Sequence, residues 1–278
     1  MRTFDELSSA QAIVSYQRRL EAKGVRAIQI TNLYQVIDAL GRMGALTNDI
    51  EAGGPYVTRW LDPRKNVLSS ESSFWIFLLD ENDQIVGKIG NRFDRLGRDS
   101  FYQYASRALR VIHPEDETAP PIERFPNVAH EISGNLAYTG DLYIHHDWRH
   151  MGLVPDLIKL DYWLVATKWT DMDWAVNYVR EEHGKKFSWT NAHWMIFKDT
   201  VDFSYPPGSP FRGHWFTCAT KERFAQLIAE EETRLRSEFL LFDLRNPDFP
   251  VGVPATPQAP QHSVRSPVHP EIQSAVHM

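Results

Sequence analysis

The sequence predicts a single α/β or α+β domain built around a central sheet, because three kinds of pattern alternate along it. Two apolar runs flank a polar turn within residues 73–90, which indicates a β-hairpin. The strand-like stretch 135–144 leads through a short polar loop into an apolar helical pattern that begins near Gly152. Further strand-like runs follow at 174–179 and 214–219. Strands and helices mixed in this order favour helices packed on one sheet.

Composition predicts where the domain begins and ends. Residues 1–24 hold an amphipathic helical pattern, which starts at the capping-box sequence Thr3–Glu6 and stops at Gly24. Residues 25–244 carry the alternating strands and helices. Residues 245–278 contain seven of the 17 prolines and few aliphatic side chains, so we expect a disordered proline-rich tail.

Three weaker patterns complete the domain. Residues 25–30 alternate like a short strand, and residues 33–40 return to helical spacing. Residues 107–127 contain four prolines and an acidic run, which predicts a long irregular surface loop before the strand at 135–144. Residues 220–239 predict a long charged helix.

Charge and cysteine content exclude several classes of protein. The 30 basic and 36 acidic side chains leave a formal charge of −6, which disfavours non-specific binding to nucleic acid or to anionic lipid. Cys218 is the single cysteine, so neither an intramolecular disulfide nor a multi-cysteine zinc site can form. The N-terminus lacks a signal-like apolar run, and 18 successive apolar residues occur nowhere. We therefore expect a cytoplasmic protein with no nucleic-acid or membrane partner.

The segment 142–157 carries the clearest chemical signal. A strand that passes through a tight loop directly into a helix leaves backbone amides exposed at the helix N-terminus, where the helix dipole also favours an anion. Gly152 lets a ligand approach the backbone closely, and Arg149 adds a permanent positive charge. These features predict a phosphate-binding site.

This segment resembles the pyrophosphate loop of the GNAT superfamily of N-acetyltransferases. Arg149, Gly152 and Leu153 match that motif, whereas His150 and Val154 depart from its small residues. The resemblance implies a mixed, mostly antiparallel sheet flanked by helices, with the hairpin as the second and third strands and 174–179 as a fifth strand splayed from the fourth. It also implies acetyl-CoA or another acyl-CoA as co-substrate, no metal, and direct acyl transfer to a primary amine in a ternary complex. The cofactor-binding residues it implies are Ile144, Arg149, His150, Met151, Gly152, Leu153 and Val154.

The family's catalytic residues have no plain counterparts in this sequence. A glutamate on the fourth strand often serves as the general base, and its position falls at or near Tyr138, which is a poor base at neutral pH. Asp141 and His145 are the substitutes, and strand alternation predicts that Asp141 faces away from Tyr138. For the residue that protonates the leaving thiolate, the first candidate is His193, near the helix expected at 191–197. Tyr178 is the second candidate, because the fifth strand at 174–179 flanks the expected thioester.

Two other functions fit parts of the sequence. The cluster His145, His146, Asp147 and His150 suggests a metal-dependent hydrolase, although no HExxH pattern accompanies it. The missing glutamate and tyrosine suggest a noncatalytic acyl-CoA-binding protein. For an acyltransferase, small-molecule and protein amines both remain open as acceptors, and a homodimer remains open as the oligomeric state.

Overall fold

The computed structural model describes residues 6–46, 54–58, 60–112, 122–181, 183–185, 194–203 and 214–245. The chain divides into two units between Arg236 and Ser237, and the description here concerns the first. The predicted proline-rich tail lies almost entirely outside the described residues. Within the described ranges, no helix combines the length and apolar character that crossing a membrane requires.

Helices and strands alternate along the described chain. The α-helices are α1 (Glu6–Glu21), α2 (Leu33–Arg42), α3 (Phe101–Ile112), α4 (Leu153–Lys168) and α6 (Lys221–Arg245), and two 3-10 helices are η1 (Asn127–His130) and η2 (His146–Met151). The strands are β1 (Arg26–Ile30), β2 (Ser73–Leu79), β3 (Ile85–Arg95), β4 (Ile122–Arg124), β5 (Asn135–Ile144), β6 (Trp174–Arg180), β7 (Met195–Phe203) and β8 (His214–Thr220).

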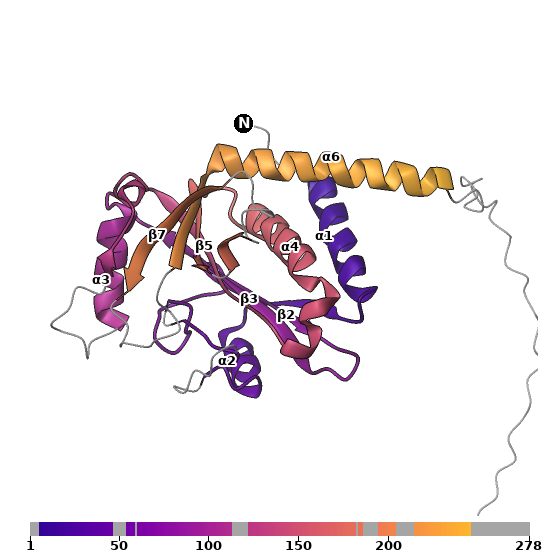
Figure 1. Cartoon of the computed structure of the whole chain (residues 1–278), viewed down its shortest axis with the longest axis horizontal. Helices are drawn as coiled ribbons and strands as arrows, with labels where there is room; N and C mark the ends of the chain where they lie inside the picture. The colour runs from indigo at the N-terminus through magenta and orange to yellow at the C-terminus, as the bar shows by residue number, and fades with distance from the viewer. Residues whose placement is uncertain are drawn as a thin grey trace, which may run out of the picture. The chain divides into compact units, whose positions relative to one another are not determined.

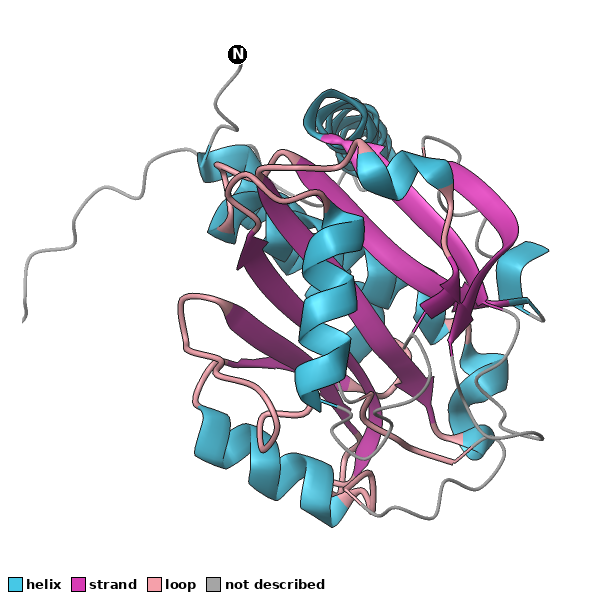
Figure 2. Cartoon of the chain, turned by 90° about the vertical axis from the view of Figure 1, so that its left-hand side faces the viewer, coloured by secondary structure: helices cyan, strands magenta, loops and turns pink. Residues whose placement is uncertain are grey.

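The described strands form one mixed sheet of eight, in the order β1-β2-β3-β5-β6-β8-β7-β4. The β5–β6 pair is parallel, and the other neighbouring pairs are antiparallel. Figure 2 shows these strands with helices on both sides of them. The predicted fold class, a mostly antiparallel sheet flanked by helices, is therefore confirmed.

Two hydrophobic clusters hold the helices on opposite faces of the sheet. Strand β2 is buried along its whole length, and its side chains alternate between the clusters. Phe74 and Ile76 face the cluster that contains residues of α1, α4 and α6, whereas Trp75 and Phe77 face the cluster that contains residues of α2 and α3. Figure 1 shows α1 and α4 on one side of the sheet and α2 on the other. We call these the α4 face and the α2 face.

Local sequence patterns predicted the central elements correctly. The hairpin at 73–90 is β2 and β3, and the strand at 135–144 is β5. The helix after Gly152 is α4, and the strand-like runs at 174–179 and 214–219 are β6 and β8.

Two predictions about the remaining segments were wrong. Residues 107–127 are not a continuous irregular loop, because α3 extends to Ile112 and β4 and η1 lie between residues 122 and 130. Residues 113–121 lie outside the described residues. Phe101 and Ala105 anchor α3 in the α2-face cluster, and this long-range burial outweighs the proline signal downstream of the helix. The helix expected near 191–197 is also absent from its described part, where β7 starts at Met195 and pairs with β8.

Candidate functional site

Strands β5 and β6 run side by side only briefly. Their parallel pairing covers three residue pairs, from Leu136 opposite Trp174 to Tyr138 opposite Val176. Beyond Tyr138, β5 remains paired with β3, while β6 remains paired with β8 up to Arg180. The two strands therefore diverge, and among the described strands none pairs with the facing edges of β5 and β6. Pairing with another described strand therefore does not occupy the main-chain polar groups on these edges.

At the far end of β5, the chain passes through η2 into α4. Gly152 has a left-handed backbone (φ 63°, ψ 34°) and forms the N-cap of α4 without a side-chain cap. The first amides of α4 therefore remain uncapped by a side chain, and a Cβ added at Gly152 would meet only Lys23 Nζ within 4 Å, at 3.6 Å. Arg149 Nε donates a hydrogen bond to the Ile144 carbonyl oxygen (3.1 Å), which closes the loop. An uncapped, glycine-led helix N-terminus fits a phosphate group.

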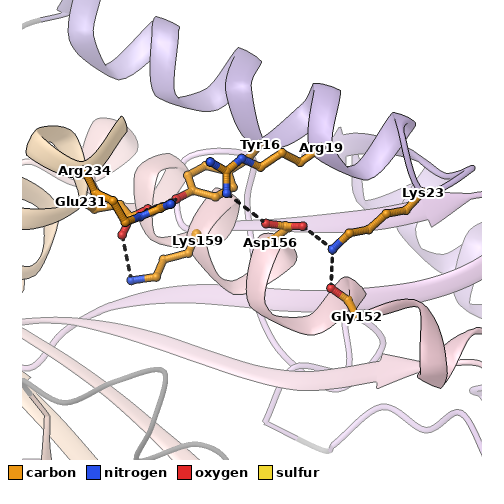
Figure 3. Close-up of polar contacts among 8 residues, drawn as sticks. All are labelled: Tyr16, Arg19, Lys23, Gly152, Asp156, Lys159, Glu231 and Arg234. Carbon is orange, nitrogen blue, oxygen red and sulfur yellow. Dashed lines mark hydrogen bonds and ion pairs between the residues drawn. The ribbon is translucent and has the colours of Figure 1, made fainter. Parts of the chain in front are cut away.

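Helix α1 and the turn that follows it supply two further positive charges at this end of α4 (Figure 3). Lys23 Nζ lies 2.6 Å from both the Gly152 carbonyl oxygen and the Asp156 carboxylate, to which it donates hydrogen bonds. Arg19 lies 3.8 Å from the same carboxylate. Asp156 would otherwise oppose an anion at the helix N-terminus, so these two cations offset its charge.

Replacing Lys23 with methionine tests how much its contacts with Gly152 and Asp156 stabilise the folded protein. We expect the free energy of unfolding to fall by about 1–2 kcal/mol, because the mostly buried Asp156 carboxylate loses its shortest partner. Urea unfolding measures the change. Arg18→Met, at an exposed position of α1, is the control and should change the free energy of unfolding by less than about 0.5 kcal/mol. Equal effects of the two substitutions would contradict the role given to Lys23.

Two tyrosines stand where β5 and β6 begin to diverge. Tyr138 is buried on the α2 face, and its ring centroid lies 5.8 Å from that of Tyr178 on β6 and 6.2 Å from that of Trp60. The Tyr138 hydroxyl lies over Gly140, since a Cβ added there would come within 2.4 Å of it. Aromatic rings therefore border the point of divergence.

A β-bulge interrupts β5 just beyond these tyrosines. Gly90 of β3 pairs with Gly140, but Lys88 pairs with Tyr143, so two β5 residues, Asp141 and Leu142, oppose one residue of β3. Asp141 is left-handed, with φ 56°, a conformation that aspartate and asparagine adopt more readily than most residues.

The bulge overturns the expectation that Asp141 faces away from Tyr138. The Thr58 main-chain N–H donates to Asp141 Oδ2 (2.9 Å), and Trp60, two residues further along that segment, contacts Tyr138. Both side chains therefore face the α2 side of the sheet. Strict alternation fails here because the additional residue of the bulge reverses the direction in which Asp141 points.

Asp141 shares this buried site with Lys88. The Lys88 side chain is fully buried, and its Nζ donates to the Asp141 main-chain oxygen (2.8 Å). Burial raises the pKa of the Asp141 carboxyl, which the nearby Lys88 charge and the Thr58 hydrogen bond partly oppose. Burial likewise lowers the pKa of the Lys88 ammonium, which Asp141 partly opposes. Asp141 Oδ1 and Thr58 Oγ1 are buried and have no hydrogen-bond partner among the residues that the structure describes.

The Tyr56 ring lies between cations from two strands. Lys88 Nζ on β3 is 5.7 Å from its centroid, and Arg180 Cζ on β6 is 5.1 Å from it. Because β5 separates β3 from β6 in the sheet, Tyr56 spans the region where β5 and β6 diverge. Both distances are within the range of cation–π attraction.

A second buried carboxyl lies on the α4 face. Asp161 of α4 accepts a hydrogen bond from Asn91 Nδ2 (2.5 Å), and Thr139 Oγ1 lies 3.4 Å from its other oxygen. Thr139 also donates to Asn91 Oδ1 (2.6 Å). Burial raises the pKa of Asp161 to about 7, although the hydrogen bonds from Asn91 and Thr139 to its carboxyl act to lower it. Thr139 is the first β5 residue beyond the β6 pairing, so this network lies next to the divergence.

His145, a further candidate base, lies away from Asp141. His145 follows β5, where its main-chain N–H donates to the Val86 oxygen (2.7 Å) and its Nδ1 lies 3.5 Å from the Asp147 carboxylate. At the rise of an extended strand, the four residues from Asp141 to His145 span on the order of 10 Å. His193 lies outside the described residues.

Part of the histidine cluster considered as a metal site does come together. Donor atoms of His145, His146 and Asp147 lie within 4.8 Å of one another on a half-exposed to exposed turn. The described group of donors does not include His150. Three donors on such a turn lack the enclosed, hydrogen-bonded surroundings that orient metal ligands in most sites.

Sequence reasoning missed Lys88, Asn91 and Asp161. Lys88 stands within the apolar strand pattern 85–89, and Asp161 stands within the apolar helix pattern 157–165. A charged residue inside an apolar run is the signal that could have identified both, because burying a charge requires a partner or a function.

No protein-family model matches the sequence, and no curated protein sequence matches it. Several solved structures are similar to this chain. FeeM, an N-acyl amino acid synthase from uncultured soil microbes, is 11% identical, with 73% of this chain and 94% of that chain covered and a TM-score of 0.43. Arylalkylamine N-acetyltransferase 2 from Aedes aegypti is 14% identical, with 70% of this chain and 98% of that chain covered and a TM-score of 0.42. Arabidopsis thaliana NAA60 in complex with acetyl-CoA is 8% identical, with 71% of this chain and 99% of that chain covered and a TM-score of 0.41.

The arrangement of this chain's own strands agrees with the fold that the sequence resemblance to the GNAT superfamily implied. The hairpin β2–β3, the fourth-strand position at β5 and the splayed parallel neighbour β6 occur where the sequence resemblance expected them. The loop with Arg149 and Gly152 follows β5 and leads into α4.

Proposed function

We propose that this protein is an acyl-CoA-dependent N-acyltransferase, most simply one that transfers an acetyl group to a primary amine. The observation that carries the proposal is the short parallel pairing of β5 and β6, followed by their divergence and by the glycine-led N-terminus of α4. One ligand with an amide-containing arm and a pyrophosphate matches both features. The arm hydrogen-bonds to the diverging edges of β5 and β6, and the pyrophosphate binds the N-terminus of α4.

The cofactor end of the proposed site is the turn from β5 into α4. The backbone amides of Gly152, Leu153 and Val154 bind the pyrophosphate, and Arg149 contributes charge. Ile144, His150 and Met151 border the same group. The open backbone at Gly152 supports this assignment, because its hydrogen leaves room that a side chain would fill.

The chemistry takes place near the β5 bulge. The acceptor ammonium gives one proton to Asp141, and the resulting amine attacks the thioester carbonyl, which forms the N–C bond. Collapse of the tetrahedral intermediate breaks the C–S bond. The second proton lost by the nitrogen reaches the leaving sulfur through Tyr178 or His193, with Tyr138 in the family's general-base position and His145 as the alternative base. Burial that raises the pKa of Asp141 supports its role as the proton acceptor.

Calorimetric titration with acetyl-CoA tests the cofactor site. We expect the parent protein to bind, and Gly152→Glu to weaken binding at least 100-fold, because a carboxylate then faces the pyrophosphate. Gly152→Ala is the control for backbone strain at the left-handed position and should weaken binding by less than about tenfold.

The outcomes separate the alternatives. No binding by a folded parent would refute the proposal. Binding without release of free CoA thiol, across a broad panel of amines, would instead support the noncatalytic acyl-CoA-binding protein.

A further inference from the structure

The β5 bulge holds a buried lysine and a buried aspartate that do not satisfy each other. Lys88 is fully buried, and its three ammonium hydrogens have one acceptor among the described residues, the Asp141 main-chain oxygen. The Asp141 side chain uses Oδ2 to accept from the Thr58 amide, while Oδ1 has no partner in the described part of the chain. The site therefore holds spare donors and a spare acceptor side by side.

Such an arrangement is costly unless a ligand completes it. A buried charge or polar atom without a hydrogen bond destabilises the folded state, so native interiors pair nearly all of them. Here the unused groups are of opposite character, because Lys88 can only donate and ionised Asp141 can only accept. A ligand that satisfies both must carry an acceptor and a donor close together.

The surroundings favour a negatively charged group on the ligand. Lys88 and Arg180 approach the Tyr56 ring from two strands, so two positive charges border the divergence of β5 and β6. A polyamine would bring a second ammonium against these cations, whereas a carboxylate would be attracted to them. A simple amine would bind Asp141 but leave the Lys88 donors unused.

We propose that the acceptor is an amino acid, whose carboxylate binds Lys88 and whose amine binds Asp141. This inference rests on the proposed acyltransferase function and names its acceptor class. The Lys88 ammonium donates to the acceptor carboxylate, and the acceptor ammonium donates to Asp141 Oδ1, the oxygen that lacks a partner. The Tyr56 ring lies beside this site, with its centroid 5.7 Å from Lys88 Nζ.

The neighbouring side chains favour an acceptor with an apolar or aromatic side chain. Trp60, Tyr138 and Tyr178 border the same face of the sheet, with ring centroids about 6 Å apart in successive pairs. Aromatic rings provide edge-to-face contacts for another ring. Phenylalanine is therefore a suitable test acceptor.

The test compares phenylalanine with 2-phenylethylamine, which has the same ring and amine but no carboxylate. We expect the wild-type protein with acetyl-CoA to favour phenylalanine at least tenfold in kcat/KM. Lys88→Met should lower kcat/KM for phenylalanine at least tenfold more than it lowers kcat/KM for 2-phenylethylamine, because only phenylalanine loses a carboxylate contact. Lys65→Met, at an exposed position, is the control and should change neither value.

Several results would overturn the inference. Preference of the wild type for 2-phenylethylamine across matched amino acid and amine pairs would do so without any variant, and this comparison stands even if Lys88→Met does not fold. Equal losses with both acceptors in a folded Lys88→Met would assign Lys88 a structural role instead. If the protein binds acetyl-CoA and acylates only amines that lack a carboxylate, the inference fails while the proposed function stands. If the folded protein does not bind acetyl-CoA, both fail.

Discussion

Asp141→Asn is expected to lower kcat for acyl transfer about 100- to 10,000-fold, because the substitution removes the proposed proton acceptor. Asparagine suits this position in two respects. It adopts the left-handed backbone of the bulge readily, and its amide oxygen can still accept the hydrogen bond from the Thr58 amide. The affinity for acetyl-CoA should change by less than about twofold, since the cofactor end of the site lies at the turn into α4.

The measurement is steady-state release of CoA thiol, together with calorimetric titration of acetyl-CoA. His145→Ala serves as the comparison, because His145 is the alternative base and lies beyond the end of β5. Loss of kcat in His145→Ala but not in Asp141→Asn would assign the base to His145. Unchanged kcat in both variants would remove both residues from the mechanism.

Asp161 should make the free energy of unfolding fall as the pH rises from about 4 to about 7. Its pKa is about 7 in the folded protein, and an aspartate in an unfolded chain has a pKa of about 3.9. Between these values the folded state binds a proton that the unfolded state has lost, so each pH increase favours unfolding. The stabilisation that this bound proton gives the folded state is complete below pH 4 and lost above pH 7, and it amounts to on the order of 4 kcal/mol.

Asp161→Asn isolates this effect from the other titrating groups. Asparagine keeps the size of the side chain and carries no charge, so we expect the variant to lack the Asp161 component of the pH dependence. The difference in unfolding free energy between variant and wild type, from urea unfolding at several pH values, should rise with pH toward about 4 kcal/mol in the variant's favour. Asp38→Asn, at an exposed position, is the control. A constant difference across this range would contradict a buried, protonated Asp161.

Local patterns predicted the elements that form the candidate site. Apolar runs around a polar turn identified the β2–β3 hairpin, and the strand, loop and helix order identified β5 and α4. The left-handed Gly152 at the start of α4 also agrees with the role expected of a glycine there. These features depend on neighbours within a few residues, which is why a single sequence contains them.

Local patterns misjudged segments that distant contacts shape. The prolines after residue 113 suggested a loop from Arg107, yet burial of Phe101 and Ala105 against the sheet accompanies a helix that continues to Ile112. The segment after residue 194 pairs with β8 as a strand, although a helix was expected near it. In both places the free energy of tertiary packing exceeds the local preference.

The sequence by itself determined the order of the central strands and helices and the glycine-led turn at Gly152, because both follow from short-range periodicity and backbone chemistry. Only the tertiary structure decided how the polar groups meet. Lys88 reaches Asp141 across 53 residues, Asp161 reaches Asn91 across 70, and Lys23 reaches Gly152 across 129. The bulge that turns Asp141 toward Tyr138 depends on the register between β3 and β5, which strand pairing sets and periodicity within one strand does not.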